Sequence, residues 1–327
     1  MAKKRPGEFA LIERYFRPLA TERGAFGLAD DAALYRQRPG DDLVLTADMV
    51  VAGVHFFADD PPESIARKAL RVNLSDLAGK GAEPFAYLLS LALPGNWTEA
   101  WLKRFAGGLA ADQKRYGVTL LGGDTTKAAG GLTIAITALG RVPKGRMVLR
   151  SGARPGDAIF VSGTIGDGAL GLRLRQGTIV GKARGGRHLL DRYLHPEPRT
   201  ALAPVLRGHA SSAMDVSDGL VGDLAHICEA SGVGAEIGAH LVPLSPGAKA
   251  FLAADASALA TILNGGDDYE IIATVPGSSV AAFAAEAKQA GVPVTRIGMI
   301  VAGKGPPVVR DTAGKVVKVS AKSHTHF

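Results

Sequence analysis

The sequence is poor in cysteine, in aromatic residues and in long apolar runs. Among its 327 residues Cys228 is the single cysteine, which excludes an intramolecular disulfide and a cysteine-rich zinc site. No run approaches the roughly 20 apolar residues that a membrane span requires. The N-terminal basic residues are followed by Glu8 and Glu13 rather than by an apolar segment, so no signal peptide is expected. We therefore expect a protein of the reducing cytoplasm that does not act in a membrane.

The common nucleotide-binding and hydrolase motifs are missing as well. The chain contains no G-x-x-x-x-G-K-[ST] loop, no protein-kinase H-R-D or D-F-G signature and no G-x-S-x-G elbow. The segment from Gly166 to Gly171 matches G-x-G-x-x-G after a predicted strand, but the next acidic residue is Asp191. A dinucleotide site therefore stays a weak alternative, and ATP would need another kind of site.

The net charge is positive, but it does not distinguish between classes of ligand. A formal charge of +7 suits nucleic acid, a membrane surface or a small anionic substrate. The densest basic runs, Lys3–Arg5 and Lys182–Arg187, are not interleaved with aromatic side chains as in a single-strand binding platform. We expect no nucleic-acid partner, and a basic nucleic-acid-binding protein is kept as the alternative of another class.

Length and hydrophobic periodicity predict two lobes in which helices and strands alternate. The chain exceeds the size at which a single core usually stops growing. The turn at Pro143–Gly145 places the boundary near Arg146, giving domains 1–146 and 147–327. The expected helices and strands are, in order, Glu8–Ala20, Leu43–Thr46, Glu63–Ala78, Phe85–Leu93, Thr98–Tyr116, Val118–Leu121, Leu132–Val142, Ala158–Ser162, a helix after Gly166, Ala213–Val216, Asp218–Ala230, Tyr269–Val275, Ser279–Gln289 and Thr295–Val301.

Aspartates recur where apolar runs end or where glycines bend the chain. Six segments show this pattern: Asp30-Asp31, Asp48, Asp76, Asp124, Asp215 with Asp218, and Asp267-Asp268. Taken singly, such residues are better explained by helix caps and turns, and Asp31 and Asp218 both stand where an N-cap is expected. Taken together, they favour one acidic cleft.

An acidic cleft needs cations, because several buried carboxylates repel one another and lose solvation. Oxygen ligands without a cysteine or histidine cluster favour Mg²⁺ over zinc. Magnesium between carboxylates and phosphates is typical of phosphoryl transfer, in which the protein contributes positioning and electrostatics. The residues therefore predict a magnesium-dependent phosphoryl-transfer enzyme.

The motifs, in their order along the chain, resemble the thiamine-monophosphate kinase family within the aminoimidazole-ribonucleotide-synthetase-like superfamily. The likeness covers nearly the whole chain. The segments that carry it are Gly7-Glu8-Phe9, Leu11-Ile12, Arg14-Tyr15-Phe16, Asp30-Asp31-Ala32-Ala33, Ala52-Gly53, His55-Phe56, Asn73 to Ala78, Gly122 to Thr126, Arg150-Ser151-Gly152 and Asp215 to Leu220.

The resemblance implies a mixed α/β (α+β) fold in two lobes and a homodimer. The first lobe, 1–146, would bind ATP and several Mg²⁺ ions and pair its sheet with that of a partner, while 147–327 would form an α/β domain. The implied magnesium positions are Asp31, Thr46, the Ala47 backbone, Asp48, Asp76, Asp124, Asp215 and Asp218. The implied ATP contacts are Gly123, Asp124, Arg150 and Ser217, and the implied substrate contacts are His55, Asp267 and His324.

The implied reaction transfers the γ-phosphoryl of ATP directly to thiamine monophosphate. The acceptor is a phosphate monoester with a second pKa of about 6, so it is already anionic at neutral pH and needs no catalytic base. Two positions depart from the family, which usually has Glu at Asp267 and an aromatic residue near His324. The main alternative is another ATP-dependent synthetase of the superfamily, such as an aminoimidazole-ribonucleotide-synthetase-like enzyme.

Overall fold

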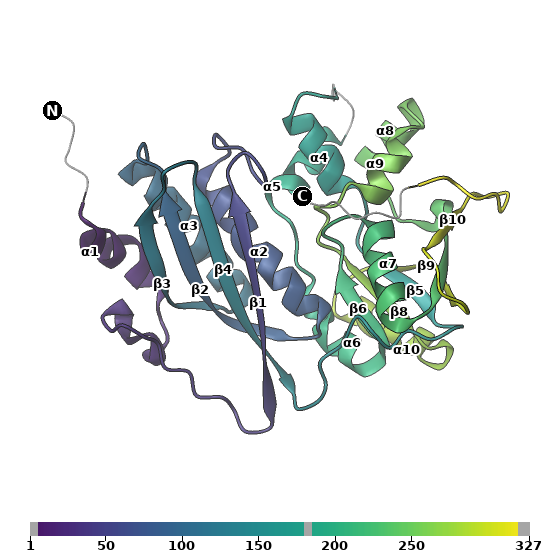
Figure 1. Cartoon of the computed structure of the whole chain (residues 1–327), viewed down its shortest axis with the longest axis horizontal. Coiled ribbons are helices and arrows are strands. Elements are labelled where there is room, and N and C mark those ends of the chain that lie inside the picture. The colour runs from purple at the N-terminus through teal and green to yellow at the C-terminus, as the bar shows by residue number, and fades with distance from the viewer. Residues whose placement is uncertain (1–5, 180–184, 320–327) are drawn as a thin grey trace. The chain divides into compact units, whose positions relative to one another are not determined.

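The structure is a computed structural model that describes residues 6–179 and 185–319 (Figure 1). The chain forms two compact units. The first comprises the described residues up to Leu77 together with Glu83–Gly145. The second comprises Ala78–Ala82 and the described residues from Arg146 onward.

The first unit begins with short helical turns and continues into a four-stranded sheet. Its elements are α1 (Glu8–Leu11), η1 (Ile12–Phe16), η2 (Arg17–Leu19), η3 (Arg23–Leu28), β1 (Asp41–Val51), α2 (Pro62–Gly79), β2 (Glu83–Leu93), α3 (Glu99–Tyr116), β3 (Thr119–Lys127) and β4 (Thr133–Pro143). The strand order is β1-β4-β2-β3, and only the β2–β3 pair is parallel. Strand β1 is therefore an edge strand.

Helices α2 and α3 lie behind the sheet in Figure 1 and cover one of its faces. Strand residues facing them, such as Ile134, Ile136 and Leu91, are almost fully buried. Helix α3 begins where the Thr98 hydroxyl accepts a hydrogen bond from the Trp101 N–H, and it ends at Gly117 in the left-handed conformation. Along each strand, side chains alternate between the two faces of the sheet. On β1, Leu45 and Met49 point away from the helices and stay exposed.

The second unit is built around a six-stranded sheet. Its elements are β5 (Ala158–Ser162), α4 (Asp167–Arg175), α5 (Gly186–Leu194), η4 (Thr200–Leu202), α6 (Ala203–His209), β6 (Ser212–Asp215), α7 (Leu220–Ser231), β7 (Gly234–Gly238), η5 (Ala239–Leu241), α8 (Pro246–Ala254), α9 (Ala258–Asn264), β8 (Ile271–Val275), η6 (Gly277–Ser279), α10 (Val280–Gln289), β9 (Val294–Val301) and β10 (Val308–Arg310). The strand order is β10-β7-β9-β5-β8-β6. Central strand β5 is buried throughout, as its apolar run Ala158–Val161 indicates.

Two expectations about the carboxylates are wrong. Asp48 does not end a strand, because β1 continues three residues beyond it to Val51. Asp124 likewise lies inside β3 rather than after it. The N-cap interpretations also fail: no helix follows Asp31, and the N-cap of α7 is Gly219 rather than Asp218. The predicted helix at Glu8–Ala20 is a succession of α, π and 3₁₀ turns.

Among the described residues, no helix combines the length and the apolar character needed to cross a membrane.

Candidate functional site

Three of the predicted magnesium positions meet at the outer edge of β1. The Thr46 hydroxyl donates a hydrogen bond to Oδ2 of Asp76, which lies near the end of α2. The N–H of Asp48 donates to Oδ1 of the buried Asn73 at 3.0 Å. Asn73 is held in turn by the Ala69 carbonyl one helical turn earlier, at 3.0 Å. Helix α2 thus uses the side chains of Asp76 and Asn73 to satisfy the edge of β1, so Thr46, Asp48 and Asp76 all lie along this contact between β1 and α2.

Asp124 belongs to the opposite face of the same sheet. Residues directly opposite each other on paired strands share a face, and the register aligns Asp124 with Ser90, Ser90 with Ala135 and Ala135 with Met49. This row lies on the face that the helices leave open, whereas Asp48 is aligned with the buried Ile136 on the covered face. Within the first unit, Asp124 is therefore not joined to the group at the edge of β1.

Gly123 is required by the packing of β3 on β2. Its φ angle is +154°, and a Cβ atom built at this position would lie 1.8 Å from the Leu89 carbonyl oxygen. No side chain could be accommodated without separating the strands. The glycine predicted to contact ATP therefore also fixes the position of Asp124, the next residue.

Asp31 and the Ala47 side chain stay apart from the other donors. Asp31 follows a run of left-handed residues, Phe26 to Leu28, and is exposed, with its N–H donating to Oδ1 of Asp30 at 2.8 Å. Ala47 points to the open face of β1. Within residues 6–179 and 185–319, no three His, Cys, Asp or Glu side chains form a group that could hold a metal ion.

His55 is fixed in the loop that follows β1. Its Nδ1 accepts a hydrogen bond from the Val51 N–H at 3.1 Å. A ring nitrogen that accepts from a backbone N–H carries no proton, so a neutral imidazole carries its proton on Nε2. The third predicted substrate contact, His324, lies outside the described residues.

In the second unit, two loops that are distant in sequence interlock. The N–H of Asp267 donates to the Ser217 carbonyl at 2.8 Å, and the N–H of Tyr269 donates to the Val216 carbonyl at 2.8 Å. A Cβ atom on Gly266 would lie 2.3 Å from the Ser217 oxygen, so only glycine permits this approach. The structure thus joins a predicted substrate residue, Asp267, to a predicted ATP contact, Ser217.

Asp267 and Tyr269 adopt an unusual backbone conformation for this contact. Their φ angles are +64° and +52°, in the left-handed region that side chains with a Cβ rarely occupy. Such residues cost on the order of 1–3 kcal/mol each and are concentrated at functional sites. The strain at Asp267 independently supports a functional interpretation of this loop.

Sequence reasoning missed Asp223, which organises the 215–219 loop. Its side chain is 1% exposed, and its Oδ2 accepts hydrogen bonds from the N–H groups of Ser217 and Asp218 at 3.0 Å each. Its Oδ1 is buried and accepts no hydrogen bond from the described part of the chain. The signal in the sequence is an aspartate in the first turn of α7, where a carboxylate can reach back to the preceding loop.

Burial raises the pKa of the Asp223 carboxyl to about 7. The two backbone hydrogen bonds and the positive charge of Arg150 act in the opposite direction, and the Asp218 carboxylate adds to the increase. The positive charge of Arg150 therefore lies near enough to act on the Asp223 carboxyl. Asp215, at the end of β6, is also buried.

The glycine motif before α4 has a structural role. The carboxylate of Asp268 accepts hydrogen bonds from the N–H groups of Gly166 at 2.8 Å and Gly168 at 3.0 Å. It therefore occupies the helix N-terminus where a dinucleotide fold would hold pyrophosphate. Gly168 also packs against the Asp267 backbone, where a Cβ atom would lie 2.1 Å from the carbonyl oxygen. These contacts oppose the dinucleotide alternative.

Comparison with known proteins identifies both halves of the chain. Residues 29–142 match the N-terminal domain, and residues 154–310 the C-terminal domain, of AIR synthase related proteins. The thiamine-monophosphate kinase of Caulobacter vibrioides is 46% identical over 306 residues, which cover 92% of this chain and 86% of that protein.

Solved structures agree with this likeness and confirm the expected fold. The thiamine-monophosphate kinase of Stenotrophomonas maltophilia K279a superposes with a TM-score of 0.83 at 39% identity, covering 95% of this chain and 98% of that one. A structure described as AaThiL complexed with AMPPCP and TMP superposes with a TM-score of 0.77 at 31% identity, covering the whole of both chains. The predicted family is confirmed: this chain belongs to the thiamine-monophosphate kinases, within the AIR synthase related proteins.

Proposed function

We propose that this protein transfers the γ-phosphoryl group of ATP to thiamine monophosphate and releases thiamine diphosphate. The observation that carries the proposal is its likeness, over most of its length, to a thiamine-monophosphate kinase at 46% identity. A related structure that superposes over the whole chain is described as a complex with AMPPCP and TMP, an ATP analogue and the proposed acceptor. The strained Asp267 loop and the edge of β1 provide oxygen donors of the kind this chemistry uses.

The donor set fits magnesium. Thr46, Asp48 and Asp76 offer hydroxyl and carboxylate oxygens, the ligands that this small hard cation prefers. We propose that these three residues are magnesium positions, and that Asp31, the Ala47 backbone, Asp124, Asp215 and Asp218 are further magnesium positions. Bound Mg²⁺ would supply positive charge that lets two phosphates approach each other.

The remaining site residues position the two substrates. We assign Gly123, Asp124, Arg150 and Ser217 to ATP, and His55, Asp267 and His324 to thiamine monophosphate. Because the acceptor phosphate is already anionic at neutral pH, no side chain has to remove a proton from it. The chain's own task is to hold the acceptor oxygen in line with the γ-phosphorus, so the transfer is direct and forms no phosphorylated enzyme.

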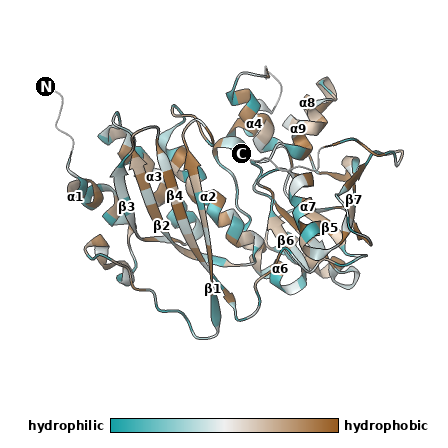
Figure 2. Cartoon of the chain, viewed as in Figure 1, coloured by the Kyte–Doolittle hydropathy of each residue, from teal (hydrophilic) through white to brown (hydrophobic). Residues whose placement is uncertain are grey.

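We further propose that the protein is a cytoplasmic homodimer. The open face of the first sheet carries Leu45 and Met49, which are 60% and 57% exposed, together with Leu43 and Leu88. Figure 2 shows hydrophobic residues along β2 and β4 as well, and the buried ones among them, such as Ile134 and Ile136, face the helices. An apolar face of this extent on a sheet suits a second copy of the chain. In this assignment 1–146 binds ATP and magnesium and forms the dimer, and 147–327 is the α/β domain.

The test is ATP-dependent formation of thiamine diphosphate by the purified protein, with and without Mg²⁺. We expect Asp124→Asn to lower kcat/KM by about 10²–10³-fold, the usual cost of removing one electrostatic contact to the transferring group. Asp41→Asn, at the start of β1 and outside the proposed site, is the matched control and should retain activity. A phosphorylated enzyme that passes its group to thiamine monophosphate would disprove direct transfer. Product formation that is independent of Mg²⁺ would disprove the metal assignment.

A further inference from the structure

The second unit contains a buried cluster of charged side chains that the proposed reaction does not use. Glu270 is fully buried, and its carboxylate accepts two hydrogen bonds from Arg199, at 2.7 Å from Nε and 2.5 Å from Nη2. Arg192, which is also buried, donates to the same carboxylate at 2.9 Å, and the Ser162 hydroxyl donates to it at 2.6 Å. Both oxygens of one enclosed carboxylate are therefore satisfied by side chains from separate segments.

Stability alone does not explain a buried cluster of this kind. Removing charged groups from water is costly, and apolar residues of similar volume often stabilise a core as well or better. Charge-assisted hydrogen bonds are short and directional, so they fix the relative positions of the groups that they join. The Glu270 cluster is therefore expected to fix the backbone of the segments that carry it.

The segment that carries Glu270 is the strained loop that contains Asp267. Nη2 of Arg192 donates to the Asp268 carbonyl at 3.1 Å as well as to the Glu270 carboxylate, so one guanidinium group holds both the backbone and a side chain of this loop. The left-handed residue Tyr269 lies between these two contact points, and the left-handed Asp267 lies directly before them. Arg192 thus anchors the part of the loop in which the strain is concentrated.

The end of β5 is shaped to receive the cluster. The φ angle of Gly163 is +54°, and a Cβ atom built there would lie 2.1 Å from Oε1 of Glu270 and 2.5 Å from Nη2 of Arg199. The preceding residue, Ser162, donates to Glu270 and accepts a hydrogen bond from the Ile271 N–H at 2.8 Å. The strand therefore leaves room for the carboxylate and also holds the backbone directly after it.

We propose that Arg192 and Glu270 are positioning residues for thiamine monophosphate, because they hold Asp267 in the left-handed conformation in which it meets the substrate. The inference rests on the proposed function, in which Asp267 contacts the acceptor, and adds to it the buried side chains that act through Asp267. Without these anchors the loop relaxes towards negative φ angles, which side chains with a Cβ prefer, and the Asp267 carboxylate leaves its place.

Arg192→Met tests the proposal, because it removes the donors and keeps an apolar stem. Glu270 stays paired with Arg199 and Ser162, so no buried charge is left uncompensated. We expect the Kd for thiamine monophosphate, measured by isothermal titration calorimetry, to rise about tenfold, equivalent to ~1.4 kcal/mol. Arg192→Lys keeps the charge and a donor, and should recover part of the loss.

A double-mutant cycle shows whether Arg192 acts through Asp267. In an Asp267→Ala background the effect of Arg192→Met on this Kd should disappear, because the side chain that Arg192 positions is already gone. Equal losses in the two backgrounds would overturn the inference. Arg310→Met is the matched control: it breaks an Arg–Glu pair with Glu236 in the same unit and should leave the Kd unchanged.

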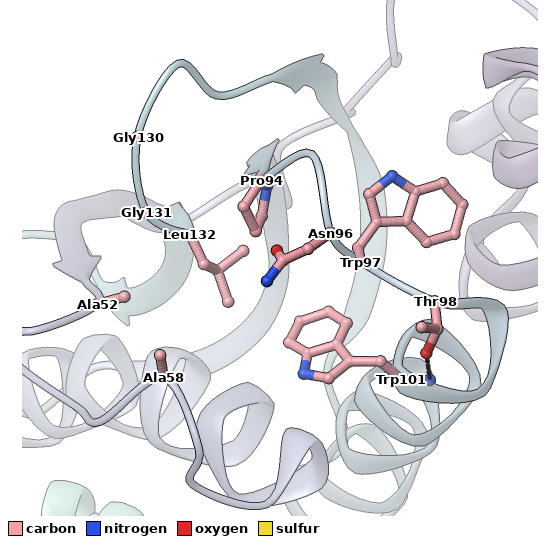
Figure 3. Close-up of a pocket in the computed structure, with 10 residues that line it drawn as sticks. All are labelled: Ala52, Ala58, Pro94, Asn96, Trp97, Thr98, Trp101, Gly130, Gly131 and Leu132. Carbon is pink, nitrogen blue, oxygen red and sulfur yellow. Dashed lines mark hydrogen bonds between the residues drawn. The ribbon is translucent and has the colours of Figure 1, made fainter.

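Amide hydrogen exchange reports on the loop without any substrate. Peptides that contain Asp267 and Tyr269 should exchange faster in Arg192→Met than in the wild type, because both N–H groups lose their acceptors when the loop relaxes. The two tryptophans of the chain, Trp97 and Trp101, line a cavity of the first unit (Figure 3). Unchanged tryptophan emission therefore confirms that the first unit of the variant is folded.

The outcomes separate this inference from the proposed reaction. If the wild type forms thiamine diphosphate but Arg192→Met changes neither the Kd nor the exchange, the positioning role is overturned and the reaction stands. If the wild type forms no thiamine diphosphate, the proposed reaction fails. Faster exchange in Arg192→Met would then still support the part of the inference in which Arg192 holds Asp267, and unchanged exchange would overturn it.

Discussion

Asp223 illustrates how a side chain outside the predicted set can control those within it. Its carboxylate accepts hydrogen bonds from two backbone N–H groups of the 215–219 loop, and these belong to Ser217 and Asp218. A buried carboxylate with one oxygen lacking a hydrogen-bond partner is costly to maintain. This cost is expected where a loop has to hold one conformation for nucleotide and metal binding.

This role predicts different effects for two substitutions of Asp223. Asp223→Ala leaves two N–H groups without an acceptor, and we expect kcat/KM for ATP to fall at least about tenfold, or ~1.4 kcal/mol. Asp223→Asn keeps an acceptor oxygen for both groups, so it should retain most of the activity. Steady-state kinetics with ATP as the varied substrate, alongside circular dichroism to confirm folding, measure the difference. Equal losses in the two variants would contradict a positioning role.

At the scale of elements, the N-terminus of α4 is occupied by the side chain of Asp268. Asp268 accepts from the Gly166 and Gly168 N–H groups and is fully enclosed, being 2% exposed. Burial is the main cause that raises the pKa of this carboxyl from 3.8 to about 8, and the two hydrogen bonds only partly oppose it. The protonated form therefore persists in the folded protein at pH values where the unfolded chain is ionised.

The sign of the resulting pH dependence follows from linkage. Because the folded-state pKa is raised, the stability that Asp268 contributes is complete below pH 3.8 and is lost as the pH rises towards about 8. We predict that the unfolding free energy of the wild type, relative to that of Asp268→Asn, declines between pH 4 and pH 8. Urea unfolding of both proteins across this range measures it. A constant difference would show that Asp268 titrates normally.

The elements also show which parts of the fold the sequence predicts. Apolar periodicity locates most of the strands and the helices α2, α3, α7 and α10, because side-chain burial generates that pattern. It misses β7 and β10, predicts one long helix at Glu8–Ala20 where there are short turns, and fails at the ends of β1 and β3. Strand β1 continues past Asp48 because Asn73 of α2 satisfies its edge, and β3 continues through Gly123 because a residue without Cβ can pack on Leu89.

The sequence singles out candidate site residues but does not show how they are arranged in space. Aspartate at unusual positions along the chain singles out Asp48, Asp124 and Asp218. Their faces depend on strand register, and their partners lie tens of residues away, as Asp267 does from Ser217. Local sequence does not encode such pairings, so the contacts of Asp223 emerge only from the structure.

At the scale of the whole molecule, the open face of the first sheet predicts association of two copies. Alternate residues of β1 leave Leu43, Leu45 and Met49 exposed on the face opposite α2 and α3. Water contact with such a face is unfavourable by about 25 cal/mol for each Å² of apolar surface. A standard interface removes about 800 Å² per partner from water, which a four-stranded sheet face can supply.

We therefore predict that Leu45→Glu converts a dimer into a monomer. Leu45 is 60% exposed in the single chain, so the substitution should leave the fold of the first unit intact while placing a charge in the interface. Sedimentation equilibrium measures the mass, and Leu241→Glu, at an exposed leucine of the second unit, is the matched control that should remain dimeric. A monomeric wild type, or a Leu45→Glu variant of unchanged mass, would contradict pairing through this sheet.

Because Asp124 lies on the same face as Met49, a partner docked there would also cover Asp124. Loss of the dimer should then lower kinase activity, although Leu45 itself belongs to no proposed binding site.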